Sequence, residues 1–215
     1  MSDSEQDGPD FEEPRLEVEG FVVDYLSWRI EQDHLEWYEQ PELPYGVQPE
    51  HEMMRKVCYI FERRHKAELN ELANELLENE YLTFSRYCEV VDEFGRTADE
   101  MENGMSYGRL VGLISFSGLV GARLYARNFR REVQQLSTYT AKFIDKRIRL
   151  TWAEDDRNWK NFMGIAADIV RRDTLQREAA ERRRSSRRWS LIGIGAAALV
   201  GVGAIIGTRV LLAGK

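Results

Sequence analysis

Residues 110–122 lie between Arg109 and Arg123 and contain no charged side chain, although charged residues make up 31% of the chain. As a helix this stretch measures about 20 Å, well short of the roughly 30 Å of a bilayer's hydrocarbon core. Its apolar residues leave no polar face, which is typical of a helix that other elements enclose. The stretch therefore predicts a central helix that the rest of the fold surrounds.

The surrounding segments repeat apolar residues at helical spacing. Such patterns cover residues 15–30, 50–78, 83–94, 130–150 and 152–169, and residues 40–50 hold three prolines and a glycine that predict a loop. No segment alternates with strand period, and no internal repeat is present. We expect an all-α helical bundle in which residues 107–150 form a central apolar helical hairpin surrounded by amphipathic helices, with a C-terminal transmembrane helix added.

That transmembrane helix is predicted near the C-terminus. Residues 191–207 are uncharged, an arginine cluster at 182–188 precedes them, and Trp189 and Arg209 flank them as interfacial anchors. A span so close to the last residue indicates a tail anchor whose body stays in the cytosol. The alternative is a buried core helix rich in glycine. The predicted anchor residues are Trp189, Leu191, Ile192, Leu199, Ile205 and Ile206.

Charge separates the chain into two parts. Residues 171–215 carry ten Lys or Arg against three Asp or Glu, so the rest of the chain holds a strong excess of acid. An acidic body argues against nucleic acid as a partner, since phosphate binding needs a basic footprint. We expect a disordered acidic N-terminus at 1–13, one helical domain at 14–175, a basic linker at 176–189 and the anchor at 190–212.

Motifs of catalysis are missing from the sequence. His51 begins an HEMMR segment that resembles the zinc-protease motif, but Arg55 stands where the second histidine ligand should be. No P-loop, dinucleotide fingerprint, nucleophile elbow or paired Cys-x-x-Cys occurs, and Cys58 and Cys88 form no disulfide framework. We therefore expect no catalytic residues, metal, cofactor or small-molecule substrate.

Four stretches resemble the homology motifs of the Bcl-2 (B-cell lymphoma two) family of apoptosis regulators. Together with the predicted anchor they cover most of the chain. RLEVEGFVVDYLSWRI is similar to the family's fourth motif, EHEMMRKVCYIFERRH to the third, MSYGRLVGLISFSG to the first and TWAEDDRNWKNF to the second. In the first motif the family has Asn-Trp-Gly-Arg followed by apolar residues and Phe-x-x-Gly. Here Ser106 and Tyr107 replace Asn and Trp, while Gly108, Arg109 and Phe116 are kept.

The third motif departs further from the family pattern. Its usual Gly-Asp pair becomes Cys58 and Tyr59, so the acidic residue that family ligands offer to a groove arginine is missing. This departure favours a protein that receives such a ligand helix over a proapoptotic protein that offers its own.

The resemblance implies an antiapoptotic regulator at the mitochondrial outer membrane, or at the reticulum, with its body facing the cytosol. It would bind the amphipathic helix of proapoptotic ligands bearing the third homology motif, and restrain a caspase-activating adaptor ATPase. The alternative is a membrane-permeabilising proapoptotic member of the same fold, whose 107–150 hairpin inserts into the bilayer. A third alternative is a tail-anchored scaffold protein with a coincidentally similar helical bundle.

Matching motif positions gives the residues of the implied groove. Arg109 would pair with a carboxylate of the incoming helix, unless it is a solvated or internally paired arginine, and part of the apolar set can equally be plain core. The predicted groove consists of Phe61, Arg64, His65, Leu69, Leu72, Val91, Phe94, Tyr107, Gly108, Arg109, Val111 and Phe116. Candidates for adaptor binding are Glu154, Asp155 and Asp156, whereas Trp152 and Trp159 are expected to fasten the last helix.

Overall fold

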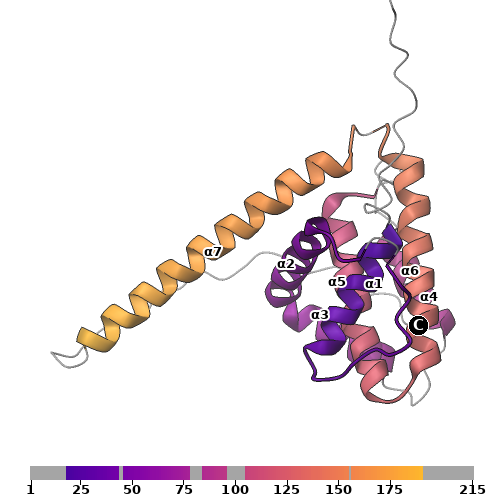
Figure 1. Ribbon diagram of the computed structural model, residues 1–215, viewed down its shortest axis with the longest axis horizontal. Helices are drawn as coiled ribbons and strands as arrows, with labels where there is room; N and C mark the ends of the chain where they lie inside the picture. Colours follow the sequence, from indigo (N-terminus) through magenta and orange to yellow (C-terminus); the bar gives the residue numbers. More distant parts are fainter. Residues whose placement is uncertain (1–17, 44–45, 78–83, 96–104, 155, 191–215) are drawn as a thin grey trace, which may run out of the picture. The chain divides into compact units, whose positions relative to one another are not determined.

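The computed structural model describes residues 18–43, 46–77, 84–95, 105–154 and 156–190, and of residues 94–95 and 183–190 it describes only the backbone. These residues form seven α-helices and no strand, arranged as in Figure 1. The helices are α1 (Val18–Glu31), α2 (Pro49–Arg64), α3 (Lys66–Leu77), α4 (Phe84–Gly95), α5 (Tyr107–Ala126), α6 (Arg130–Thr151) and α7 (Trp159–Ser190). The all-α prediction is confirmed for this part of the chain.

Helix α5 is the enclosed helix that the uncharged stretch predicts. Every residue from Leu110 to Ala122 is buried. Helices α1, α2 and α6 pack along it (Figure 1). Its N-terminus is capped by the Ser106 hydroxyl, which accepts a hydrogen bond from the backbone N–H of Arg109 at 3.2 Å. A helix without a polar face thus has apolar neighbours on each side.

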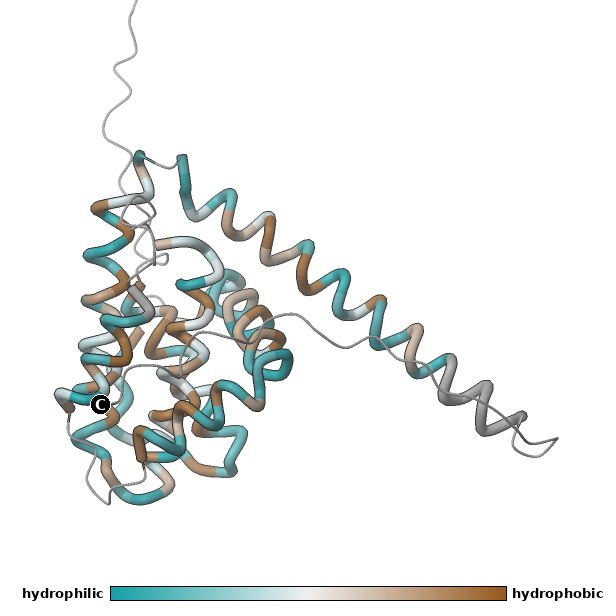
Figure 2. Tube along the Cα trace, turned by 180° about the vertical axis from the view of Figure 1, so that it is seen from behind, coloured by the Kyte–Doolittle hydropathy of each residue, from teal (hydrophilic) through white to brown (hydrophobic). Residues whose placement is uncertain are grey.

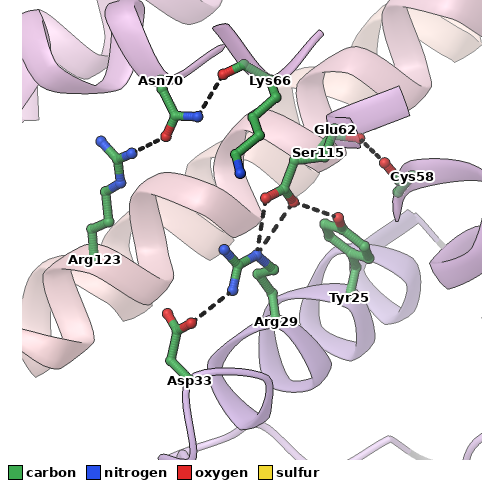
Figure 3. A network of polar contacts seen from close by, with 9 residues as sticks. All are labelled: Tyr25, Arg29, Asp33, Cys58, Glu62, Lys66, Asn70, Ser115 and Arg123. Carbon is green, nitrogen blue, oxygen red and sulfur yellow. Dashed lines mark hydrogen bonds and ion pairs between the residues drawn. The ribbon is translucent and has the colours of Figure 1, made fainter. Parts of the chain in front are cut away.

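Two ion-pair groups join α1 to α2. The Arg55 guanidinium donates two hydrogen bonds, of 2.7 and 2.5 Å, to the buried Asp24 carboxylate. About two helix turns further along α2, the Glu62 carboxylate accepts hydrogen bonds from the Tyr25 hydroxyl at 3.1 Å and from Arg29 Nε at 3.2 Å (Figure 3). Both groups fix how α1 lies against α2, which forms a wall of the site described below.

The N-terminus of α2 uses His51 as a cap. Its Nδ1 accepts a hydrogen bond of 2.9 Å from the backbone N–H of Gln48, while its ring packs against Phe21 at a centroid distance of 5.1 Å. Burial lowers the pKa of His51, which keeps the imidazole neutral and able to accept this bond. The loop predicted at residues 40–50 ends here.

Helix α6 packs its apolar side on α1, α4 and α5. Figure 2 shows it with alternating brown and teal residues, as expected of an amphipathic helix. Buried Tyr87 of α4 and Thr140 of α6 share a hydroxyl hydrogen bond of 2.6 Å. The second helix of the predicted hairpin is therefore only half apolar, in contrast to α5.

Aromatic rings fasten the start of α7, as predicted for the two tryptophans. Trp159 packs on Trp152 and on Phe21, each at a centroid distance of 4.9 Å. The Trp152 indole Nε1–H donates a hydrogen bond of 2.7 Å to the carbonyl oxygen of Met105. These contacts place the first turns of α7 beside the N-terminus of α5.

Helix α7 is longer than the short helix that the sequence pattern predicts. It continues to Ser190, because no glycine or proline follows Gly164 within it and alanine, arginine and glutamate favour helix. The chain divides into two compact units, the first ending at Thr174 and the second starting at Leu175. Among the described residues no helix is long and apolar enough to cross a bilayer. The predicted anchor residues from 191 onward lie outside them, and of Trp189 only the backbone is described.

Candidate functional site

A cavity of about 200 Å³ lies between α2, the start of α5 and the first turns of α7. Most of its lining is apolar, and Arg64 and His65 line it at the C-terminal end of α2. Six of the predicted groove residues line it together, namely Phe61, Arg64, His65, Tyr107, Gly108 and Val111. The motif positions thus converge on one hollow of the surface, although they come from two helices that are distant in sequence.

Tyr107 is held at the cavity by contacts on both ends of its side chain. Its ring packs on Trp152 and Phe162 at centroid distances of 5.4 and 5.5 Å. Its hydroxyl donates a hydrogen bond to the carbonyl oxygen of Asn158 and accepts one from the same residue's N–H, both at 3.1 Å. The tyrosine that replaces the family's tryptophan therefore fixes the connection before α7 as well as lining the cavity.

The end of α2 supplies the polar edge of the cavity. The rings of Phe61 and His65 pack with their centroids 4.4 Å apart. Arg64 Nη2 lies 3.7 Å from a carboxylate oxygen of Asp173 in α7, and its side chain is 48% exposed. An apolar hollow with a cation at one end suits a ligand that is both apolar and acidic.

Arg109 follows the lining residue Gly108 and is half-buried, but it does not itself line the cavity. It takes part in a further interaction within the chain. Its predicted role as the arginine that pairs with a ligand carboxylate stays a prediction.

Four other predicted residues lie elsewhere. Leu69, Val91 and Phe116 are buried in the core, and Leu72 is partly buried against it. Phe116 stacks on Tyr87 of α4 with the ring centroids 6.3 Å apart. Phe116 comes five residues after Val111, so the two side chains leave α5 about 140° apart and face different neighbours. The side chain of Phe94 lies outside the described residues.

Half of the cavity lining was not predicted from the sequence. The additional residues are Val57, Ile60, Phe162, Ile165, Ala166 and Ile169. The four from α7 stand at positions i, i+3, i+4 and i+7, which is the spacing of one helix face. That spacing was visible in the sequence, but the second homology motif ends at Phe162 and the remaining three follow it.

Cys58, which replaces the glycine of the family's third motif, packs against α5. Cys58 is fully buried, its Sγ lies 3.8 Å from the carbonyl oxygen of Val111, and its own carbonyl accepts a hydrogen bond of 3.2 Å from Ser115. Burial raises the pKa of the Cys58 thiol, so this cysteine is not poised as a nucleophile. In the described parts of the chain, no three His, Cys, Asp or Glu side chains gather to hold a metal ion.

Comparison with known proteins identifies the class to which this chain belongs. Residues 54–159 match the family model of the apoptosis regulator proteins of the Bcl-2 family. The chain is 42% identical to the apoptosis regulator CED-9 of Caenorhabditis elegans over 96% of its own length and 75% of that protein. The chain therefore belongs to the Bcl-2 family, whose members regulate apoptosis without being enzymes.

CED-9 is also the particular protein that two further matches name. CED-9 of Caenorhabditis briggsae is 42% identical over 92% of this chain and 74% of the relative. A crystal structure of a CED-9/EGL-1 complex matches with a TM-score of 0.70 and 44% identity, covering 75% of this chain and 98% of the other. The prediction of an antiapoptotic regulator of this family that is not an enzyme is confirmed, and the regulator is CED-9-like.

Proposed function

We propose that the cavity between α2, α5 and α7 is the part of a groove that receives the amphipathic helix of a proapoptotic ligand. An apolar hollow with basic side chains at its edge carries this proposal, because such ligands present apolar anchors at i, i+3, i+4 and i+7 together with acid. The similarity to CED-9 solved with EGL-1 supports it. Leu69, Val91 and Phe116 then pack behind the groove wall, and Leu72 lies at its margin.

Replacing Arg109 by Ala tests the charged anchor of this groove. The Kd of the full-length chain for fluorescently labelled EGL-1, measured by anisotropy in phospholipid nanodiscs, is expected to rise at least about tenfold, since losing one partner of a desolvated charge pair weakens binding strongly. Nanodiscs keep detergent out of the apolar hollow.

Arg131→Ala serves as the matched control, because it removes the same charge from an exposed position on α6. It is expected to leave the Kd within about twofold. If neither the wild type nor the control bound EGL-1, the proposed function would be wrong. Equal binding by the wild type and Arg109→Ala, at unchanged melting temperature, would remove Arg109 from the site.

We further propose that the chain restrains a caspase-activating adaptor ATPase at the mitochondrial surface. The uncharged segment 191–207 behind an arginine cluster supports anchoring by residues 190–212, and similarity to CED-9 supports the location. Glu154 and Asp156 are exposed in the connection between α6 and α7 and are candidates for the adaptor surface, as is Asp155, which lies outside the described residues.

Imaging of a fluorescent adaptor in cells that express the chain tests both statements. Wild type is expected to bring the adaptor to mitochondria. Deletion of residues 190–215 is expected to leave both proteins diffuse, and Glu154→Lys with Asp156→Lys is expected to keep the chain on mitochondria while the adaptor becomes diffuse. A deletion that still reaches mitochondria would refute the anchor, and recruitment by the charge-reversed variant would refute the acidic surface.

The permeabilising alternative receives no specific support from the described helices. Residues 110–122 of α5 are all buried within the bundle, so insertion of the α5–α6 hairpin would require the core to open.

A further inference from the structure

One acidic side chain links α7 to the polar end of the cavity. Asp173 is nearly buried, with 7% of its side chain exposed. Its carboxylate accepts a hydrogen bond from Arg63 Nη2 and lies 3.7 Å from Arg64 Nη2. Both arginines belong to the last turn of α2, where the helix dipole also favours positive charge. The contact joins residues 110 positions apart in sequence.

Asp173 continues the face of α7 that lines the cavity. It follows Ile169 by four residues and Ala166 by seven, so the three side chains lie along one side of the helix. This part of α7 therefore presents apolar residues followed by a carboxylate to α2, and the carboxylate meets the two arginines. The arrangement joins α7 to α2 at one end of the cavity.

The cavity is too small for a ligand helix while α2 and α7 stay in this position. Its volume of about 200 Å³ is close to the roughly 150 Å³ that holds one benzene molecule, whereas a helix is about 10 Å across and inserts several anchors. A ligand helix that inserts several anchors at this place needs a wider hollow, and the ion pair of Asp173 opposes the separation of α7 from α2 that would widen it.

We propose that Asp173 acts as a latch that sets the ligand affinity of the groove, by pairing with Arg63 and Arg64 until an incoming acidic amphipathic helix displaces it. This inference rests on the proposed function. The apparent Kd equals the Kd of the open groove divided by the fraction of molecules that are open. Weakening the latch raises that fraction and tightens binding, while a ligand carboxylate becomes the new partner of the released Arg64, which lines the cavity.

Two variants remove the latch from opposite sides. Asp173→Asn removes the acid, and Arg63→Gln removes the closer arginine, which is not among the residues that line the cavity. Each is expected to lower the Kd for labelled EGL-1 by at least about fivefold. The double variant is expected to bind no more tightly than the better single one, since both changes break the same pair.

Asp168→Asn is the matched control. Asp168 lies on the same helix but forms a local pair of 2.8 Å with Arg171, with 53% and 71% of the two side chains exposed. Its loss is expected to leave the Kd within about twofold. Hydrogen–deuterium exchange of α7 residues 162–173 gives a second readout, and we expect faster exchange in both latch variants than in the control.

The outcomes separate this inference from the proposed function. If the full-length wild type does not bind EGL-1, the proposed function and the latch both fail. If it binds and Asp173→Asn and Arg63→Gln leave Kd and exchange unchanged, the groove stands and the latch is refuted. Weaker binding by Arg63→Gln alone would show that Arg63 contacts the ligand instead. If Asp173→Asn fails to fold, Arg63→Gln decides the question.

Discussion

Replacing Arg55 by Gln is expected to lower the free energy of unfolding by about 3 kcal/mol, because the change leaves the carboxylate of Asp24 buried without its cation. Asp24 is 1% exposed, and the Arg55 guanidinium donates to both of its oxygens. Glutamine can replace one of the two hydrogen bonds but none of the charge. Urea unfolding of the full-length chain, followed by circular dichroism, measures the effect.

Arg149→Gln provides the comparison for this prediction. Arg149 pairs with Asp145 at 2.8 Å, but 72% and 43% of the two side chains are exposed, so water solvates either charge when the other is lost. We expect the free energy of unfolding of Arg149→Gln to differ from that of the wild type by no more than about 0.5 kcal/mol. Equal effects of Arg55→Gln and Arg149→Gln would contradict the view that burial makes the Asp24 pair important.

The position of Arg55 illustrates a limit of sequence reasoning. From the sequence, this residue only excluded a zinc-protease motif, whereas the structure pairs it with a carboxylate 31 residues earlier. A pairing over that distance leaves no local pattern. By contrast, the enclosed helix α5 was predictable, because thirteen uncharged residues in a row admit few environments other than the interior of the bundle.

The groove was predictable in part for a related reason. Motif matching gives positions along a helix, but the side of the helix that faces a groove depends on its neighbours. Phe61 and Val111 therefore line the cavity, while Phe116 faces α4. The α7 wall was missed because residues 165–169 follow the last motif, although their spacing indicated an apolar face.

Glycines in α5 look unfavourable from sequence, at about 1 kcal/mol each against alanine in a helix interior. The structure gives a reason for Gly118. A Cβ placed there would lie 2.6 Å from Cε1 of Tyr25, a fully buried ring whose hydroxyl is bound to Glu62. The absence of a side chain lets α1 approach α5 closely, and this approach also positions the residues of α1 that contact α2.

Gly118→Val is therefore expected to destabilise the chain by about 3 kcal/mol, since overpacking must displace the Tyr25 ring or separate α1 from α5. For a domain of this size the melting temperature should fall by roughly 10 °C. Gly164→Val is the control, because, apart from the adjacent residues and the backbone of α7 itself, no described atom lies within 4 Å of a Cβ built on Gly164. We expect its free energy of unfolding to change by no more than about 0.5 kcal/mol. Differential scanning fluorimetry of both full-length variants distinguishes close helix packing from a general intolerance of valine. Equal melting temperatures would show that α1 and α5 can separate at little cost.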